Sequence, residues 1–215
     1  MSAGQLLVLL VVPVLALVVV LVRGEGVAAL AHVRVRGLPW VLVGALVQVV
    51  RTADPAWAGG LLHTAGGVLP PLALAVCATG FVLANAGRAG RAARLALAAV
   101  LAGAAANALA TALNGGMPFS VDAARTAGIA PEHVAAPTPG HVPVGPDTDL
   151  VALSDVIGLP GLGVVLSIGD LLLWGGLAAV LVLGVRRAAE PTGDPGEKHH
   201  PTQAGVVPAT ERSTR

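Results

Sequence analysis

Two carboxylates and one histidine are the residues whose types suggest chemistry. His141, Asp155 and Asp170 lie in or just after a long polar segment that separates two apolar runs. A His–Asp pair can act as a general base, and two carboxylates with a histidine can hold a metal ion. Their spacing matches no established ligand pattern, and the sequence contains no Gly-x-Ser-x-Gly nucleophile motif. We therefore predict no catalytic residue, no metal site and no cofactor.

Polar side chains also recur along the apolar run before this segment. Asn107, Thr111 and Asn114 follow one another at i, i+4 and i+7, so they share one helix face, which Ala99 and Gly103 extend. Small residues let two membrane helices approach closely, and an Asn side chain can form a hydrogen bond between them. We interpret this face as a seam against a neighbouring helix, with Asn107 as the interhelical hydrogen bond.

A polar lining of a transport pathway is the alternative interpretation of these residues. Transporters often have ionisable residues near the middle of the membrane and inverted repeats, and the sequence has neither feature. The intramembrane polar residues that would form such a lining are Gln48, Asn85, Asn107 and Thr111.

Helix-end signals flank the polar segment on both sides. In "NGGMP", Gly115 follows Asn114 at the position where a left-handed glycine ends a helix, and Pro118 prevents the helix from resuming. Ser167 stands three residues before Asp170, which resembles a capping box with Asp in place of Glu. A negative charge there also suits the positive end of the helix dipole. Capping alone would therefore explain Asp170.

The composition indicates where these helices lie. Of the 215 residues, 55% are hydrophobic and only 12% are charged, and the mean hydropathy is +0.80. A soluble domain has about 25% charged residues, so this chain must expose apolar surface to lipid. The net charge of +1 and the scarcity of aromatic residues argue against nucleic acid as a partner. Cys77 is the only cysteine, which excludes an intrachain disulfide.

The pattern of apolar runs predicts an all-α integral membrane protein with five transmembrane helices. Crossing a membrane takes roughly 20 apolar residues. The predicted spans are residues 6–22, 38–53, 68–86, 95–113 and 168–185, and a long, partly ordered outer loop fills residues 115–167. We expect a short helix near residues 150–156 of this loop. The membrane domain then covers residues 1–187, and residues 188–215 form a disordered cytoplasmic tail.

The basic residues predict the orientation of these spans. If five spans alternate, all but two of the 13 lysines and arginines fall on one side, and Arg51 and Arg125 are the exceptions. Cytoplasmic loops are enriched in Lys and Arg. We therefore predict a multi-pass protein of the plasma membrane, with the amino terminus outside and the carboxyl terminus in the cytoplasm.

The order of motifs resembles a family of small bacterial polytopic membrane proteins known only as a domain of unknown function. The shared pattern is Asn-Gly-Gly, Met-Pro, a loop His, Leu-x-Asp and Ser-x-Gly-Asp. The resemblance covers about residues 1–187 and implies a multi-pass membrane protein without implying an activity. The pattern falls on Asn114, Gly115, Gly116, Met117, Pro118, His141, Asp155, Ser167, Gly169 and Asp170.

Three classes of function remain open from the sequence. The first is a structural or accessory membrane protein that contacts the lipid bilayer and binds a membrane-protein partner or a second copy of itself. It would display the polar cluster at its outer face. The first alternative is a small-solute or ion transporter. The second is a membrane-embedded enzyme that uses His141 with Asp155 or Asp170.

Overall fold

The computed structural model describes residues 18, 36–53, 55–63, 67–135 and 140–189. The predicted first span, apart from residue 18, lies outside the described residues, and so does the predicted tail from residue 190 onward.

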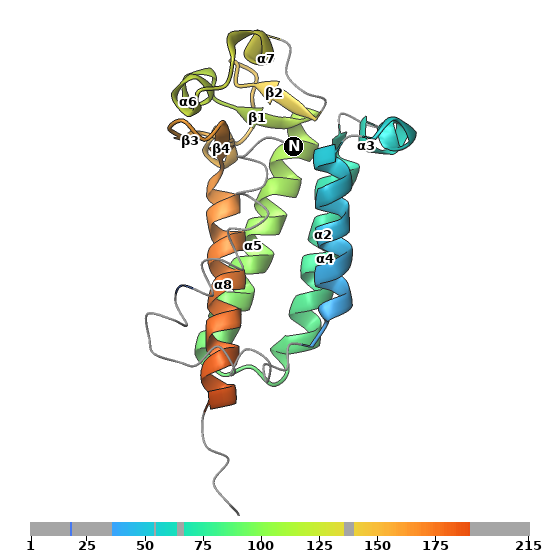
Figure 1. The fold of residues 1–215 in the computed structure, drawn as a ribbon, viewed down its shortest axis with the longest axis vertical. Helices are drawn as coiled ribbons and strands as arrows, with labels where there is room; N and C mark the ends of the chain where they lie inside the picture. Colours follow the sequence, from blue (N-terminus) through green and yellow to red (C-terminus); the bar gives the residue numbers. More distant parts are fainter. Residues whose placement is uncertain (1–17, 19–35, 54, 64–66, 136–139, 190–215) are drawn as a thin grey trace, which may run out of the picture.

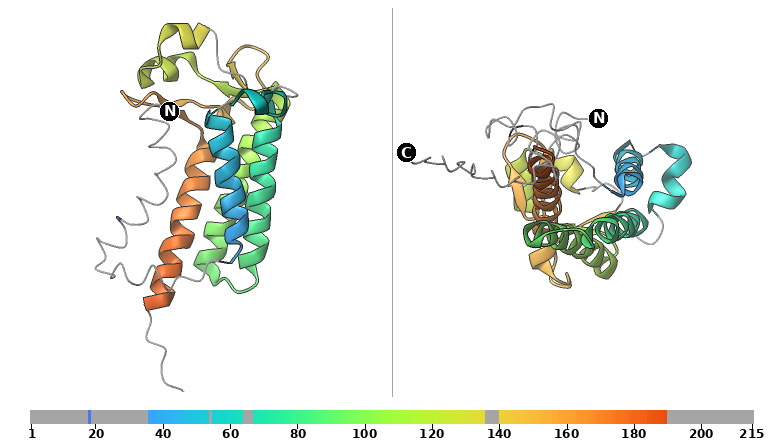
Figure 2. Two further views of the ribbon diagram at one scale, coloured as in Figure 1. Left: turned by 45° about the vertical axis from the view of Figure 1, so that its right-hand side comes forward. Right: turned by 90° about the horizontal axis from the view of Figure 1, so that it is seen from below.

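Four apolar helices form the body of the described structure. They are α2 (Leu38–Ala53), α4 (Leu69–Ala86), α5 (Arg91–Asn114) and α8 (Ile168–Ala189). Helices α4, α5 and α8 are long and apolar enough to cross a membrane, and α2 is a shorter apolar helix. The four run antiparallel to their neighbours in an arc, in the order α2, α4, α5, α8 (Figures 1 and 2). The sequence-based bounds agree within four residues at each helix end, whereas the number of five spans stays a prediction.

Small side chains bring these helices together. Helix α2 meets α4 where the Trp40 ring lies over Gly80, a site at which a Cβ atom would collide with the indole. Between α4 and α5 the buried contacts are mostly alanine and valine, with Phe81 and Leu97 as the larger members. The large aliphatic side chains instead lie exposed on the outer faces, as with Val76 and Leu83. Small residues inside and large apolar residues outside are typical of helices that pack within lipid.

The closest helix pair is α5 with α8. A Cβ atom at Gly103 would collide with the carbonyl oxygen of Gly169, and one at Gly176 would lie 2.7 Å from the carbonyl oxygen of Ala96. Gly169, Leu173 and Gly176 recur at i, i+4 and i+7, so they form one stripe along α8. The predicted seam at Gly103 is therefore confirmed, and its partner helix is α8.

The basic residues of three segments lie together at the end of the body away from the outer loop. Asn85 Nδ2 donates a 2.7 Å hydrogen bond to the carbonyl oxygen of Arg36. At the same end, Arg187 Nη1 donates to the carbonyl oxygen of Arg88 at 3.4 Å. The described parts of the segments that the sequence grouped on one side thus share one end of the molecule. Which side of a membrane that end faces stays a prediction.

Residues 115–135 and 140–167 form a folded cap on the opposite end of the body (Figure 1). Strand β1 (Met117–Phe119) pairs in parallel with β2 (His141–Pro143), and β3 (Ile157–Leu159) pairs antiparallel with β4 (Val164–Leu166). The short helices are α6 (Val121–Ala127) and α7 (Pro131–Ala135). The prediction of a short helix near 150–156 is wrong beyond one turn: only Val151–Leu153 is helical, as the 3-10 turn η4, and the chain is extended from Ser154.

One more element connects α2 and α4 at the cap end. It consists of the 3-10 turn η2 (Ala56–Ala58) and the short helix α3 (Gly59–His63), which project sideways from the body (Figures 1 and 2). The cap, this projection and the adjoining ends of all four helices therefore lie at one end of the molecule.

Candidate functional site

A three-residue polar network joins α5 to the start of α8. Asn107 Nδ2 donates to Asp170 Oδ1 at 2.8 Å, and Ser167 Oγ lies 3.0 Å from Asn107 Oδ1. The backbone N–H of Ser167 donates to Asp170 Oδ2 at 2.9 Å, and the backbone N–H of Asp170 donates to Ser167 Oγ at 3.0 Å. The last two bonds form a capping box. Both predictions, the cap and the interhelical bond of Asn107, are confirmed, and one carboxylate serves both.

Glycine is required beside this network. A Cβ atom at Gly169 would collide with Asn107 Oδ1, so only glycine lets the amide reach across to α8. Ser167 is fully buried and Asp170 is half-buried. Hydrogen bonds to a charged group at a partly buried site are each worth about 1.5–3 kcal/mol. The network therefore contributes strongly to holding the start of α8, where the cap ends, against α5.

A second set of hydrogen bonds joins the end of α5 to the cap. Gly115 has φ 66°, the left-handed conformation predicted for a helix stop. Asn114 Oδ1 accepts from the backbone N–H of Asp149 at 2.8 Å, and Asn114 Nδ2 donates to the carbonyl oxygen of the same residue at 3.0 Å. Asn114 therefore clamps the loop backbone rather than reaching an acidic side chain. Deeper in α5, Thr111 Oγ1 donates to the carbonyl oxygen of Asn107 at 2.8 Å and lies 3.6 Å from Met117 Sδ.

Strand β1 lies between His141 and Asp155, one of the two pairs on which the enzyme interpretation depends. His141 is the register partner of Met117 on one edge of β1, and Gly116 and Pro118 are buried around this pairing. Asp155 lies on the other edge, where its N–H donates to the carbonyl oxygen of Pro118 at 2.8 Å. Strands hydrogen-bond to neighbours on opposite edges, so β1 lies between the backbone of His141 and the backbone of Asp155.

Asp155 is the electrostatically unusual residue of the cap. Its side chain is 8% exposed. Burial, followed by the neighbouring Asp170, raises the pKa of Asp155 to about 8, although the nearby Arg51 acts in the opposite direction. An acid held in its neutral form near neutral pH can bind or release a proton in the physiological range.

Two residues near Asp155 were missed by the sequence interpretation. Arg51, in the last turn of α2, is one of only two basic residues predicted on the outer side, and it lies within electrostatic range of both Asp155 and Asp170. The sequence feature that could have pointed to Arg51 is its predicted place on the side of the membrane that has almost no other basic residue. Ser154 is fully buried, and its Oγ has no hydrogen-bond partner among the described residues. Nothing in the sequence marks Ser154.

The other predicted intramembrane polar residues do not join this cluster. Asn85 lies at the far end of the body, where it binds the backbone of Arg36 and of Phe81. Gln48 is half-buried on α2, which packs on α4. Within the described part of the chain, no three His, Cys, Asp or Glu side chains gather into a group that could hold a metal.

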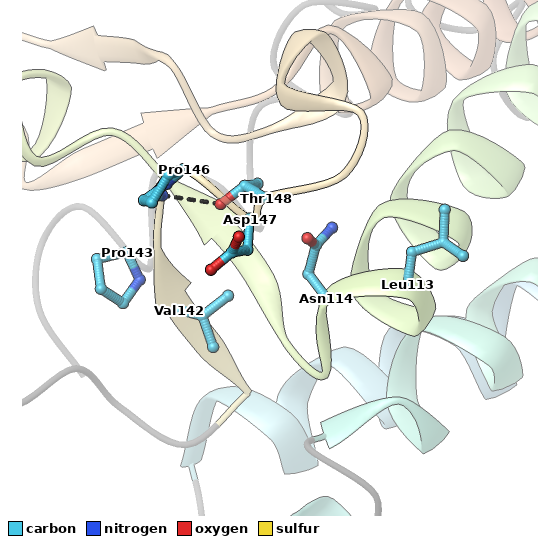
Figure 3. Close-up of a pocket in the computed structure, with 8 residues that line it drawn as sticks. Leu113, Asn114, Val142, Pro143, Pro146, Asp147 and Thr148 are labelled. Atoms are coloured by element: carbon cyan, nitrogen blue, oxygen red, sulfur yellow. Dashed lines mark hydrogen bonds between the residues drawn. The ribbon is translucent and has the colours of Figure 1, made fainter.

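A shallow polar recess lies on the cap surface beside Asn114 (Figure 3). Its volume is about 330 Å³, and it is open to solvent. Asp147 and Thr148 lie on one side and Asn114 and Leu113 on the other, and Thr148 Oγ1 accepts from the backbone N–H of Gly145 at 2.8 Å. The recess is formed by a tight turn, so its walls are fixed by the same clamp that holds Asp149.

Comparison with known proteins identifies the family. Residues 32–182 match the model of a family of unknown function, DUF5317, so the chain belongs to that family. This confirms the resemblance found from the motifs and extends over the four helices and the cap. No curated protein and no solved structure matches the chain.

Proposed function

We propose that this member of the DUF5317 family is an accessory protein of the plasma membrane that presents a rigid outer cap to a partner protein. In this proposal, α2, α4, α5, α8 and a further span before α2 cross the bilayer, and the cap lies outside the cell. The apolar, lipid-compatible surfaces of the helices support the membrane location, and the basic residues at the end opposite the cap support the orientation.

One observation favours the accessory role over the alternatives. The polar side chains of Asn107, Asn114, Ser167 and Asp170 are all engaged in hydrogen bonds that join α5 to α8 or the cap to these helices. Groups used in this way make a surface rigid, and a rigid surface loses little conformational entropy when a partner binds. The recess beside Asp147 and Thr148 is the concave part of that surface.

Site-specific photo-crosslinking in intact cells tests the proposal. A photoreactive residue in place of Asp147, on the exposed rim of the recess, should yield a discrete adduct with one protein. The matched control is the same residue in place of Val76, which is 59% exposed on α4 and should react mainly with lipid. If position 147 gives no protein adduct, and the gently solubilised protein migrates as a monomer in native gels, the accessory role is wrong.

A second candidate function is favoured by Asp155 alone. A carboxyl group with a pKa of about 8, beside Asp170 and Arg51 at the outer ends of α8 and α2, suits a proton-linked step in the movement of a small solute. The discriminating measurement is proton uptake by vesicles that contain the full-length protein when an outward-to-inward pH gradient is applied. Uptake that is lost in Asp155→Asn supports this candidate, and equal uptake in both proteins excludes it.

A further inference from the structure

Two apolar elements project sideways where the helices meet the cap. One is the β3–β4 hairpin beside the start of α8, and the other is the η2–α3 segment beside the end of α2 (Figures 1 and 2). On the hairpin side, Val156 is 43% exposed and Leu162 is 43% exposed. On the other side, Trp57 is 76% exposed and Leu61 is 65% exposed. Large apolar side chains gathered on projecting elements indicate a contact that covers them.

Charge distinguishes these projections from the rest of the cap. Residues 156–168 contain no Asp, Glu, Lys or Arg, and neither do residues 55–62. The part of the cap that lies farther from the helices instead has exposed charges, including Asp122, Arg125 and Glu132. The two projections are thus free of formal charge, whereas exposed charges lie elsewhere on the cap, including Asp147 and Asp149 beside the end of α5.

The hairpin also continues an apolar surface of the body. Ile168 and Leu171, in the first turn of α8 directly after the hairpin, are 48% and 47% exposed. The hairpin itself is held in place, because α6 lies against it so closely that a Cβ atom at Gly158 would collide with the carbonyl oxygen of Ala123. The exposed side chains of the hairpin therefore continue the exposed apolar face of α8 in a fixed position.

From these features we infer that the β3–β4 hairpin and the η2–α3 segment are interfacial anchors that rest in the headgroup–acyl boundary of the outer leaflet. Trp57 is the residue type that prefers this boundary, because its ring is apolar and its N–H is polar. The two anchors lie on opposite sides of the helix arc, so together they fix the depth and tilt of the cap. This inference rests on the proposed membrane location.

Depth measurements on spin-labelled protein in phosphatidylcholine vesicles test the inference. Single cysteines are introduced into the full-length Cys77→Ala protein at the two anchors, as Leu162→Cys and Leu61→Cys. The matched controls are Val76→Cys on the lipid-facing side of α4 and Thr126→Cys on the exposed face of α6. All four sites are exposed, so the label need not disturb packing. Collision with oxygen relative to a water-soluble nickel chelate then reports depth.

The inference predicts a graded result. Position 76 should be deep, position 126 should be in water, and positions 162 and 61 should be intermediate, with oxygen favoured over the nickel chelate. If the label at position 76 is deep but the label at position 162 or 61 is as accessible to water as the label at position 126, the proposed anchors are wrong and the membrane location stands. If position 76 itself behaves like 126, the membrane location fails. Dipolar broadening between labels at position 162 would instead place a second copy on the hairpin and overturn the lipid contact.

Discussion

Replacing Asp170 by asparagine is the sharpest perturbation of the network that fastens the cap. The wild-type carboxylate accepts from Asn107 through Oδ1 and from the backbone N–H of Ser167 through Oδ2. An asparagine keeps one oxygen acceptor, which can serve Asn107. Its NH₂ group then faces the Ser167 N–H, and two donors cannot bond to each other. The substitution preserves shape and removes the capping half of the network.

The expected cost follows from that lost bond. A hydrogen bond to a charged group contributes about 1.5–3 kcal/mol, and Asp170 is half-buried, so we expect a loss of about 2 kcal/mol. For a chain of this size, such a loss lowers the midpoint of thermal unfolding by about 4–8 °C. The matched control is Asp122→Asn, which breaks the exposed 2.9 Å Asp122–Arg125 ion pair of α6. Exposed pairs contribute at most about 1 kcal/mol.

The protein contains its own reporter for this experiment. Cys77 is the only cysteine and is 7% exposed on α4, so a thiol-reactive fluorogenic dye reacts with it only as the helices separate. Unfolding is followed in detergent for wild type, Asp170→Asn and Asp122→Asn. The reasoning is refuted if the midpoint of Asp170→Asn lies within the range of wild type and Asp122→Asn.

Two further predictions concern protonation and helix packing. The pKa of Asp155 is about 8 in the folded protein and 3.8 in its ordinary state, so the unfolded chain loses the Asp155 proton at lower pH than the folded chain does. The midpoint temperature of wild-type unfolding should therefore fall as the pH rises from about 4 to about 8. Asp155→Asn should remove that fall, since Asp170 and Arg51 then face a neutral amide; an unchanged pH profile would contradict the assignment. Gly176→Ala should lower the midpoint because its Cβ atom would lie 2.7–2.8 Å from the α5 backbone, whereas Gly175→Ala, with nothing within 4 Å, should leave it unchanged or raise it. Equal effects of the two substitutions would show that the seam is not close-packed.

Features governed by local rules could be predicted from the sequence. The bounds of α2 agree at both ends, at Leu38 and Ala53, because a mostly apolar run begins after Gly37 and ends in the polar residues Arg51 and Thr52. The stop at Gly115 follows from the conformational freedom of glycine. The Ser167–Asp170 cap follows from the spacing of the two residues. Each of these depends on residues a few positions apart.

Features that depend on distant contacts could not be predicted in this way. Strands β1 and β2 have three residues each, which is too few for an alternating pattern of apolar and polar residues to be recognised. Their pairing also joins Met117 to His141, which are separated in the sequence by helices α6 and α7. Arg51 was counted only for topology, because its electrostatic influence on Asp155 depends on where the folded cap lies relative to the end of α2. The same folding places His141 and Asp155 on opposite edges of β1, which spacing alone does not reveal.

The side of the membrane on which the cap lies is the central claim of this account, and labelling in intact cells tests it most directly. Cys77→Ala protein with Thr126→Cys, on the cap, is compared with the same protein carrying Ala92→Cys, exposed in the first turn of α5. A membrane-impermeant maleimide should label position 126 in intact cells and position 92 only after the cells are permeabilised. Labelling of position 92 in intact cells, with position 126 protected until permeabilisation, would contradict the proposed orientation.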